Sequence, residues 1–318
     1  MKFKRIDAFD MNFEECACHL NYKLESTQGV GEKWLYVGHN EELLDEFFDL
    51  NNIESFIFLK KDLQNYLIDA KEEYYTPVQL YKNDISKFYE DNVKNTNAIV
   101  SDIIELHFTK KYDSQKRYYL NFRRDGFSSD NYDYFRNIAL PRVTKLSFVK
   151  LQNVKSGKLY IYIKPFFYID EKEKIEKEIE LKISNGDTSS SKTYRKQQVK
   201  YRQELLESMP SCLITNVTED RILEACHIKP FSKCESEEEQ YDVANGIVLT
   251  PTYHVLFDLG FISFKDNGTI LISPFLSNMN KSRLQLIDGK TYRIPKKCSK
   301  YLEYHRKNIY NQIPDLTV

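Results

Sequence analysis

Hydrophobic residues recur at intervals of three and four in two stretches near the start of the chain. These stretches are residues 41–50 (EELLDEFFDL) and residues 61–74 (KDLQNYLIDAKEEY). Such spacing places the apolar side chains on one face, so each stretch predicts an amphipathic helix. From about residue 101 the pattern changes to alternation, most clearly at residues 118–123 and 158–164. Alternation indicates strands that bury one face, and we expect the other face, rich in lysine and tyrosine, to meet solvent or a ligand.

A polar stretch follows these predicted strands. Residues 170–182 carry a dense mixture of charges, and residues 185–192 (NGDTSSSK) favour turns and resist ordering. A chain of 318 residues also exceeds the length of one typical domain. We therefore predict an α+β protein of two domains, with a mixed helix and antiparallel-sheet domain at residues 1–190 and a second domain at residues 191–318.

The second domain shows short apolar segments between polar turns. A helix is predicted over residues 194–209, and the segments at residues 212–215 and 223–228 predict the two strands of a β-hairpin. After a polar and acidic loop, residues 247–249 re-enter the core, and Pro251 suits the first turn of a helix. The predicted order is therefore strand, strand, helix.

Three polar side chains in this domain suggest chemistry. His227 lies at the end of the second predicted strand, and His254 and Asp258 stand four residues apart on the predicted helix, on one face. An imidazole and a carboxylate in this arrangement can bind one divalent cation. A histidine has an ordinary pKa of about 6.5, so His227 can accept a proton at neutral pH and is free to act as a base beside that ion.

The same segment resembles a known family. It contains the words ACHIKPF, NGIVLTPTYHVLFD and GFISFKDNGTILIS, in this order. These words resemble the HNH endonuclease motif, and the three lettered positions correspond to His227, Asn245 and His254. The resemblance covers about a fifth of the chain and implies a C-terminal ββα-metal nuclease domain that hydrolyses phosphodiester bonds of double-stranded DNA.

The resemblance also implies a role for each residue. His227 deprotonates the attacking water, and Asn245 braces the loop that orients His227. One divalent cation, held by His254 and Asp258, stabilises charge on the phosphate and on the departing 3′ oxygen. Lys229 is expected to contact a phosphate. No organic cofactor is implied.

One position departs from the family pattern. Many members carry Asp or His just before the base histidine as a further metal ligand, whereas this chain has Cys226. A thiol is a poor ligand for Mg²⁺ but suits softer metals. Either Cys226 packs as a small hydrophobic residue and the expected ion is Mg²⁺, or Cys226 is a ligand and the site favours Mn²⁺ or another transition metal. We favour the first interpretation, because cysteine in an apolar strand behaves mostly as a small hydrophobic residue.

Charge is unevenly distributed along the chain. The total of 46 Lys+Arg and 47 Asp+Glu gives a net charge of −1, which argues against a nucleic-acid partner only if the charges are evenly spread. Residues 1–100 carry a balance of −8 and residues 101–200 a balance of +8, and residues 107–165 hold 13 basic but only 4 acidic residues. This stretch predicts a basic DNA-contacting face, although a merely solubilising face is the alternative. Its candidate contacts are Arg117, Arg123, Arg124, Arg136, Arg142 and Lys145.

Several protein classes fit the sequence poorly. The chain contains no apolar run long enough for a membrane span, and the acidic residues within its first fifteen positions interrupt any secretory signal. The six cysteines are scattered and suggest reduced thiols. We expect a cytoplasmic protein.

These features together predict a metal-dependent DNA endonuclease. The large N-terminal domain suggests target recognition, and a sequence-specific type II restriction endonuclease is the first hypothesis. A modification-dependent or anti-phage nuclease and a catalytically silent DNA-binding protein remain alternatives. Because one HNH centre cuts one strand, double-strand cleavage would require a homodimer or sequential nicking.

Overall fold

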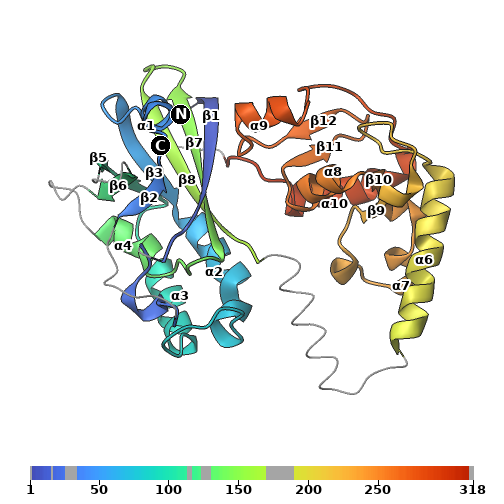
Figure 1. Cartoon of the computed structure of the whole chain (residues 1–318), viewed down its shortest axis with the longest axis horizontal. Helices are drawn as coiled ribbons and strands as arrows, with labels where there is room; N and C mark the ends of the chain where they lie inside the picture. Colours follow the sequence, from blue (N-terminus) through green and yellow to red (C-terminus); the bar gives the residue numbers. More distant parts are fainter. Residues whose placement is uncertain are drawn as a thin grey trace. The chain divides into compact units, whose positions relative to one another are not determined.

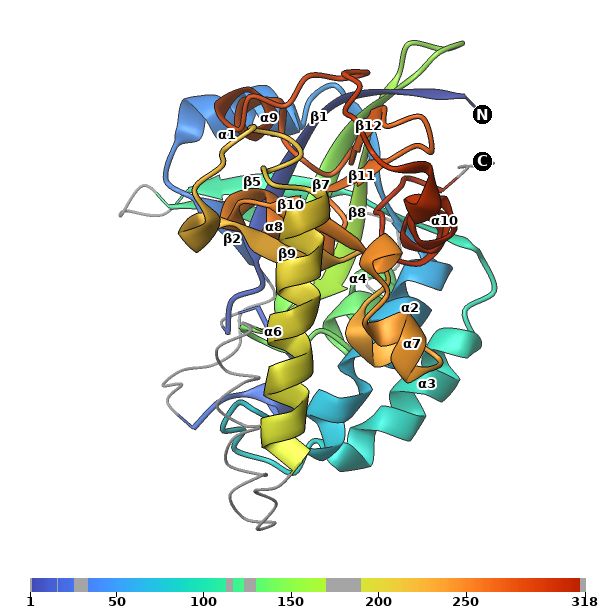
Figure 2. The same ribbon diagram turned by 90° about the vertical axis from the view of Figure 1, so that its right-hand side faces the viewer.

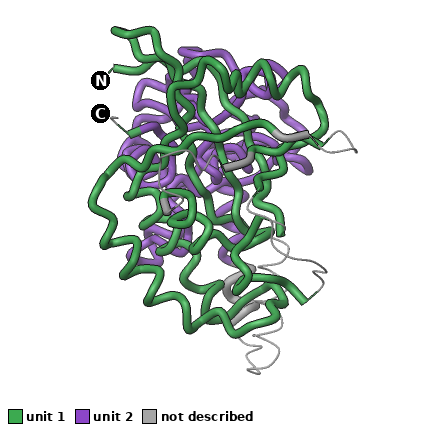
Figure 3. Tube along the Cα trace, turned by 90° about the vertical axis from the view of Figure 1, so that its left-hand side faces the viewer, with its two compact units in different colours: residues 1–179, 314–318 green, residues 180–313 purple. Residues whose placement is uncertain are grey.

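The computed structural model describes residues 2–15, 17–25, 34–112, 117–122, 130–169 and 190–314. The chain divides into two compact units (Figures 1 and 3). The N-terminal unit comprises Met1–Ile179 with Pro314–Val318, and the C-terminal unit comprises Glu180–Ile313. The predicted boundary at residue 190 adjoins residues 170–189, which lie outside the described part, so this boundary stays a prediction.

The N-terminal unit is built on a five-stranded sheet in the order β1-β7-β8-β3-β4. Neighbouring strands of this sheet are antiparallel, except that β3 and β8 are parallel. A three-stranded antiparallel sheet in the order β2-β6-β5 completes the strands of this unit. The strands are β1 (Phe3–Asn12), β2 (Leu35–Gly38), β3 (Ile53–Leu59), β4 (Ile103–Leu106), β5 (Phe108–Tyr112), β6 (Tyr118–Phe122), β7 (Thr144–Asn153) and β8 (Leu159–Phe167).

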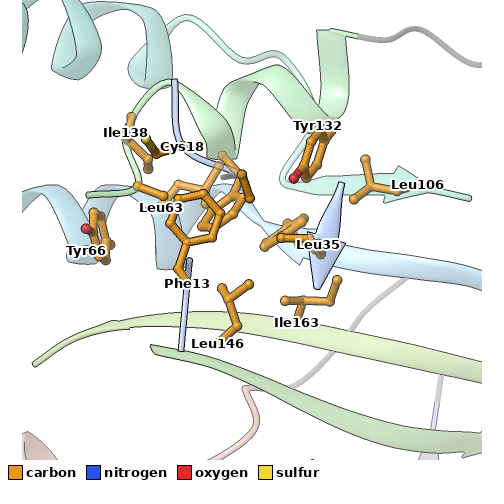
Figure 4. Packing of buried hydrophobic residues seen from close by; sticks show 14 of the residues in the cluster. Phe13, Cys18, Leu35, Leu63, Tyr66, Leu106, Tyr132, Ile138, Leu146 and Ile163 are labelled. Atoms are coloured by element: carbon orange, nitrogen blue, oxygen red, sulfur yellow. The ribbon is translucent and has the colours of Figure 1, made fainter. Parts of the chain in front are cut away.

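Helices and loops cover one face of the larger sheet and enclose the core. The helices of this unit are α1 (Glu41–Phe48), α2 (Lys60–Tyr75), α3 (Tyr89–Asn97) and α4 (Asp130–Arg136). In the core, Phe13 and Leu63 lie over Leu146 of β7 and Ile163 of β8 (Figure 4). All four side chains are fully buried, and burying each contributes roughly 1.5–3 kcal/mol relative to leaving it in water.

The predicted helices of this unit are confirmed as α1 and α2, and the alternating segments as β6 and β8. The start of α1 has a clear cause, because the Asn40 side chain accepts a hydrogen bond from the Leu43 amide. The expected open row of lysine and tyrosine is wrong for Tyr162. Its hydroxyl donates to Asp62 of α2 at 2.5 Å, which ties this strand to the helix that follows β3. The mixed helix and sheet content confirms the α+β class.

The C-terminal unit has a separate core. Its helices are α6 (Ser190–Ser208), α7 (Glu237–Gln240), α8 (Pro251–Asp258), α9 (Asn278–Arg283) and α10 (Ser299–Asn308). Its strands are β9 (Glu224–His227), β10 (Gly246–Leu249), β11 (Ile262–Phe264) and β12 (Ile270–Ile272). The strands form two antiparallel pairs, β9 with β10 and β11 with β12, and α6 packs against the first pair (Figure 2).

The predicted helix over residues 194–209 is confirmed as α6, and the helix beginning at Pro251 is confirmed as α8. The predicted hairpin is wrong in one strand. Residues 212–215 form turns, and the partner of β9 is β10, the apolar segment after the Asn-Gly turn. Leu213 instead donates its amide hydrogen bond to Val248 of β10, so this segment packs beside the strand pair without joining it.

No helix within the described residues is long and apolar enough to cross a membrane. The cysteines that the structure describes form no disulfide and are Cys18, Cys212, Cys226, Cys234 and Cys298.

Candidate active site

Strand β9 and helix α8 carry the polar side chains of the candidate site. His227 ends β9 and is opposite Gly246 of β10 in the antiparallel register. Because side chains alternate along a strand, Glu224 and Cys226 share the face opposite to that of His227. Helix α8 starts with Pro251 at its first turn and contacts β9, so His254 and Asp258 lie beside that strand.

The imidazole of His227 is held on three sides. Its Nε2 lies 2.8 Å from the backbone oxygen of Gln240. The ring stacks on Tyr201 of α6, with 4.6 Å between ring centroids and 15° between planes, and meets Phe231 edge-on at 5.7 Å. A carbonyl oxygen only accepts hydrogen bonds, so Nε2 carries the hydrogen and Nδ1 keeps its lone pair in the neutral ring. Burial lowers the pKa of His227, which favours this neutral form.

Asn245 braces the loop that holds His227 in place. Its side chain has no exposed surface, and its Oδ1 accepts the Lys229 amide at 2.8 Å. Its Nδ2 donates to the backbone oxygens of Lys229, at 3.1 Å, and Glu239, at 3.3 Å. The amide therefore joins the segment just after β9 to the segment just before Gln240, whose carbonyl binds the imidazole. This geometry supports the bracing role expected of Asn245.

His254 lies between two carboxylates. Its Nδ1 is 2.6 Å from Glu224 Oε2, and its Nε2 is 3.0 Å from Asp258 Oδ2. Burial disfavours the charged ring, but hydrogen bonds to Asp258 and to the Cys226 thiol, together with their charges, outweigh this cost and raise the pKa of His254 to about 11. The contacts with Asp258 and Cys226 thus create a position that favours positive charge on the ring.

Cys226 behaves as a buried thiol. It has no exposed surface, and its Sγ lies 3.5 Å from the backbone oxygen of Glu224. Burial raises its pKa to about 11, so the thiolate that would bind a metal is disfavoured. These observations support the interpretation of Cys226 as a small packing residue, and we leave it out of the proposed ligand set.

The donor groups at His254 fit a divalent cation. An imidazole and a carboxylate are ligands for Mg²⁺, Mn²⁺ and related ions, and the His254 and Asp258 side chains keep 27% and 42% of their surface exposed. Water and phosphate oxygens could therefore complete the coordination. Among the described residues, no three His, Cys, Asp or Glu side chains are arranged to hold one ion. This agrees with the geometry, because Glu224 and Asp258 lie at different nitrogens of the ring.

Residues 212–265, which contain all of these groups except Tyr201, match the HNH endonuclease family model. This segment is an HNH endonuclease domain. The HNH domain indicates a nuclease, and the family implies DNA as substrate and a divalent metal ion as cofactor. No curated protein matches the chain.

Two of the cations expected to contact DNA occupy buried positions. Lys229, in the HNH domain, pairs with Glu239 at 2.9 Å and keeps only 8% of its side-chain surface exposed. Arg136 is also buried, and its guanidinium donates to the backbone oxygens of Ala17 and Cys18. Lys229 is already paired with a partly exposed carboxylate and Arg136 with two backbone carbonyls, so a phosphate contact would take each cation from a partner it already has. We therefore leave both residues out of the proposed DNA interface.

The remaining candidates differ in their placement. Arg142 and Lys145 are exposed and line one pocket of about 310 Å³ with Tyr168, over whose ring the Lys145 ammonium lies at 4.4 Å. Arg117 lies over the ring of Tyr119 at 5.6 Å. Arg123 and Arg124 lie outside the described residues. The structure thus brings two of the sequence-predicted cations together.

The structure adds residues that sequence analysis missed. Glu224 contacts His254, Gln240 holds His227 through its backbone, and Tyr201 stacks on His227 from outside the matched segment. The placement of Glu224 could have been predicted from the sequence, because it stands two residues before Cys226 and strand alternation places both side chains on one face. No comparable signal marks Gln240 or Tyr201, since their roles depend on a backbone carbonyl and on helix packing.

Proposed function

We propose that this protein is a metal-dependent DNA endonuclease in which His227 is the general base and His254 and Asp258 hold the metal ion. One observation carries this proposal: His227 is fixed by a carbonyl at Nε2, which leaves Nδ1 as the basic nitrogen. A general base needs such a nitrogen, with a lone pair and with the ring held in a fixed orientation.

Each residue of the site has a different role in hydrolysis. Nδ1 of His227 accepts a proton from water, and the oxygen of that water attacks phosphorus while the bond to the 3′ oxygen breaks. His227 holds this proton until solvent takes it, while its Nε2–H continues to donate to the Gln240 carbonyl, and the departing 3′ oxygen takes a proton from water. The stack on Tyr201 prevents the ring from turning away, and Asn245 keeps the carbonyl in position.

His254 and Asp258 would hold the ion, with solvent and phosphate oxygens as further ligands. When bound, the ion supplies Lewis-acid stabilisation of the charge that develops on the phosphate and the leaving oxygen. The pair stands on one rigid helix, so its spacing does not depend on a loop. Mg²⁺ is the ion we propose, with Mn²⁺ as the alternative.

The N-terminal unit is proposed to bind the DNA target. It has its own sheets and core, and its exposed Arg142 and Lys145 flank one pocket. A large unit joined to a small nuclease domain supports the hypothesis of a sequence-specific restriction endonuclease. Cleavage of unmethylated and methylated copies of one genomic DNA, with the fragment ends mapped, tests this hypothesis. Cutting confined to methylated DNA would support the modification-dependent alternative instead.

The catalytic claim is tested by plasmid cleavage with Mg²⁺ or Mn²⁺. We expect the wild type to nick or linearise the plasmid, chelation by EDTA to stop it, and His227→Ala to lower the rate by about 10²–10⁴-fold, the usual contribution of a general base. His39→Ala is the matched control, because His39 is exposed in the other unit, and it should cleave at the wild-type rate. Equal rates for His227→Ala and wild type would refute the assignment of the base.

A further inference from the structure

Glu224 occupies an unexpected position beside the proposed metal ligand His254. It lies on β9, opposite Leu249 of β10, and its carboxylate oxygen is 2.6 Å from Nδ1 of His254. The Glu224 side chain keeps 43% of its surface exposed, so it could turn toward water, yet it contacts the imidazole. Neither the HNH motif nor the proposed mechanism assigns it a role.

The two nitrogens of the His254 ring point in different directions. Asp258 lies at Nε2, 3.0 Å away, whereas Glu224 lies at Nδ1. His254 Nε2 and Asp258 would hold the ion between them, and Glu224 lies at the other ring nitrogen, so Glu224 is badly placed to bind the same ion. The lack of a three-residue His, Cys, Asp or Glu cluster among the described residues agrees with this separation.

A neutral imidazole carries hydrogen on only one nitrogen, and a metal ion requires a lone pair on the other. A carboxylate at Nδ1 accepts the hydrogen there and therefore leaves the lone pair at Nε2. Metal-binding histidines commonly use such a second carboxylate, which orients the ring and increases its basicity.

We propose that Glu224 is a positioning residue: its carboxylate holds the Nδ1–H of His254, so that Nε2 faces Asp258 and the metal ion. This inference rests on the proposed function for the identity of the metal ligands. It adds a residue whose effect passes through His254 and which does not touch the ion or the DNA.

The first test measures Mn²⁺ affinity by isothermal titration calorimetry on the full chain. We expect Glu224→Ala to weaken binding by about 10–100-fold, the usual effect of losing such an outer partner. Glu224→Gln keeps an acceptor oxygen and should weaken binding less than Glu224→Ala and less than Asp258→Asn. Glu207→Gln, which removes one exposed carboxylate of α6, should bind as the wild type does. If Glu224→Gln and Glu224→Ala lost as much affinity as Asp258→Asn, Glu224 would be a direct ligand and the proposal would be wrong.

The second test reads the tautomer of His254 directly. In ¹⁵N-labelled protein with diamagnetic Zn²⁺, the His254 signals are identified by their loss in His254→Gln. We expect the wild type to show a protonated Nδ1 and a metal-bound Nε2, and Glu224→Ala to lose the fixed Nδ1 proton. A wild type with the ion on Nδ1 would overturn the proposal even if no Glu224 variant folds.

The two proposals fail in different ways. A protein whose Mn²⁺ affinity depends on Glu224 as expected, but which never cleaves plasmid DNA, would contradict the nuclease proposal and support the role of Glu224. A protein that cleaves DNA while Glu224→Ala binds Mn²⁺ like the wild type would contradict only the role of Glu224. The role proposed for Glu224 would also be wrong if the wild type bound no Mn²⁺.

Discussion

Three histidines of the C-terminal unit show how neighbouring groups determine the protonation state of the ring. His227 meets a backbone carbonyl, His254 meets two carboxylates, and His305 of α10 is buried between a serine and a carbonyl. Carboxylates favour the imidazolium, whereas burial beside neutral groups favours the neutral ring. Despite burial, the contacts with Asp258 and the Cys226 thiol raise the pKa of His254 to about 11, whereas burial lowers the pKa of His305 to about 4.

The burial of His305 predicts acid sensitivity of the C-terminal unit. Its ring stacks on Phe257 at 3.8 Å and is 1% exposed, and burial lowers its pKa to about 4. The unfolded chain takes up a proton below about pH 6.5, whereas the folded chain does so only below about pH 4. The contribution of neutral His305 to stability is therefore complete above pH 6.5 and is lost as the pH falls toward 4. Between pH 7.5 and 5 the loss is about 2 kcal/mol.

Urea unfolding of the wild type and of His305→Gln at these two pH values measures this loss. The difference in unfolding free energy between the two proteins should shrink at pH 5, because glutamine does not titrate. His254 is present in both proteins, so its own titration cancels. A difference that is independent of pH would contradict the prediction.

At the scale of single residues, the sequence predicted the placement of the candidate side chains on strand and helix better than the contacts that hold them. The spacing of His254 and Asp258 predicts their shared helix face, because helical periodicity is local. The partners of His227 were not predictable in this way. Gln240 acts through a carbonyl that any residue would supply, and Tyr201 lies 26 positions from the histidine in sequence. Contacts of this kind depend on tertiary packing that local patterns do not encode.

At the scale of elements, helix α6 forms part of the framework that holds His227. It lies outside the matched segment, yet Tyr201 stacks on His227 and its hydroxyl donates to the Asn245 backbone oxygen at 3.1 Å. Gly246 makes this approach possible, because a Cβ atom there would lie 2.4 Å from the Tyr201 hydroxyl. Tertiary packing also explains why the strand predicted at residues 212–215 is wrong. Residues 212–215 and residues 247–249 are both short apolar segments that could pair with β9, and the segment after Asn245 is the one that does.

Two substitutions of Tyr201 distinguish the effect of its ring stack on His227 from the effect of its hydroxyl hydrogen bond to Asn245. Tyr201→Leu removes the stack, so we expect single-turnover cleavage to slow by about 10²-fold as His227 loses its orientation. Tyr201→Phe keeps the ring and should cleave at nearly the wild-type rate, at a cost of about 1 kcal/mol in unfolding free energy for the lost hydrogen bond. Val199→Ala, an exposed change on the same helix, is the control and should alter neither quantity. A Leu variant that cuts at the wild-type rate would show that the stack does not support catalysis.

At the scale of the whole molecule, folding removes much of the charge separation seen in the sequence. Cations of the basic stretch pair with acids of the first hundred residues: Lys110 with Asp45, Arg142 with Glu15 and Lys158 with Glu54. For Arg142 and Lys158 the cause lies in the sheet topology, because β7 pairs with β1 and β8 lies beside β3. A linear count of charge treats these segments as separate, so it predicted a basic face more extensive than the described residues support.

Arg142 and Lys145 are the described cations that we propose to contact DNA in the N-terminal unit. The Arg142 guanidinium, 56% exposed, pairs with Glu15 at 2.6 Å, and such a surface pair contributes about 1 kcal/mol or less, so a phosphate can replace the carboxylate at little cost. We expect the double variant Arg142→Ala, Lys145→Ala to reduce the slope of log affinity against log salt by about 2, because two fewer counterions are released. Fluorescence anisotropy with a labelled duplex, without metal and across a salt series, measures this slope. The double variant Lys87→Ala, Lys94→Ala removes two exposed charges from the same unit, outside the basic stretch, and should leave the slope near that of the wild type. If both double variants changed the slope equally, net charge alone would account for binding and the pocket lined by Arg142 and Lys145 would have no special role.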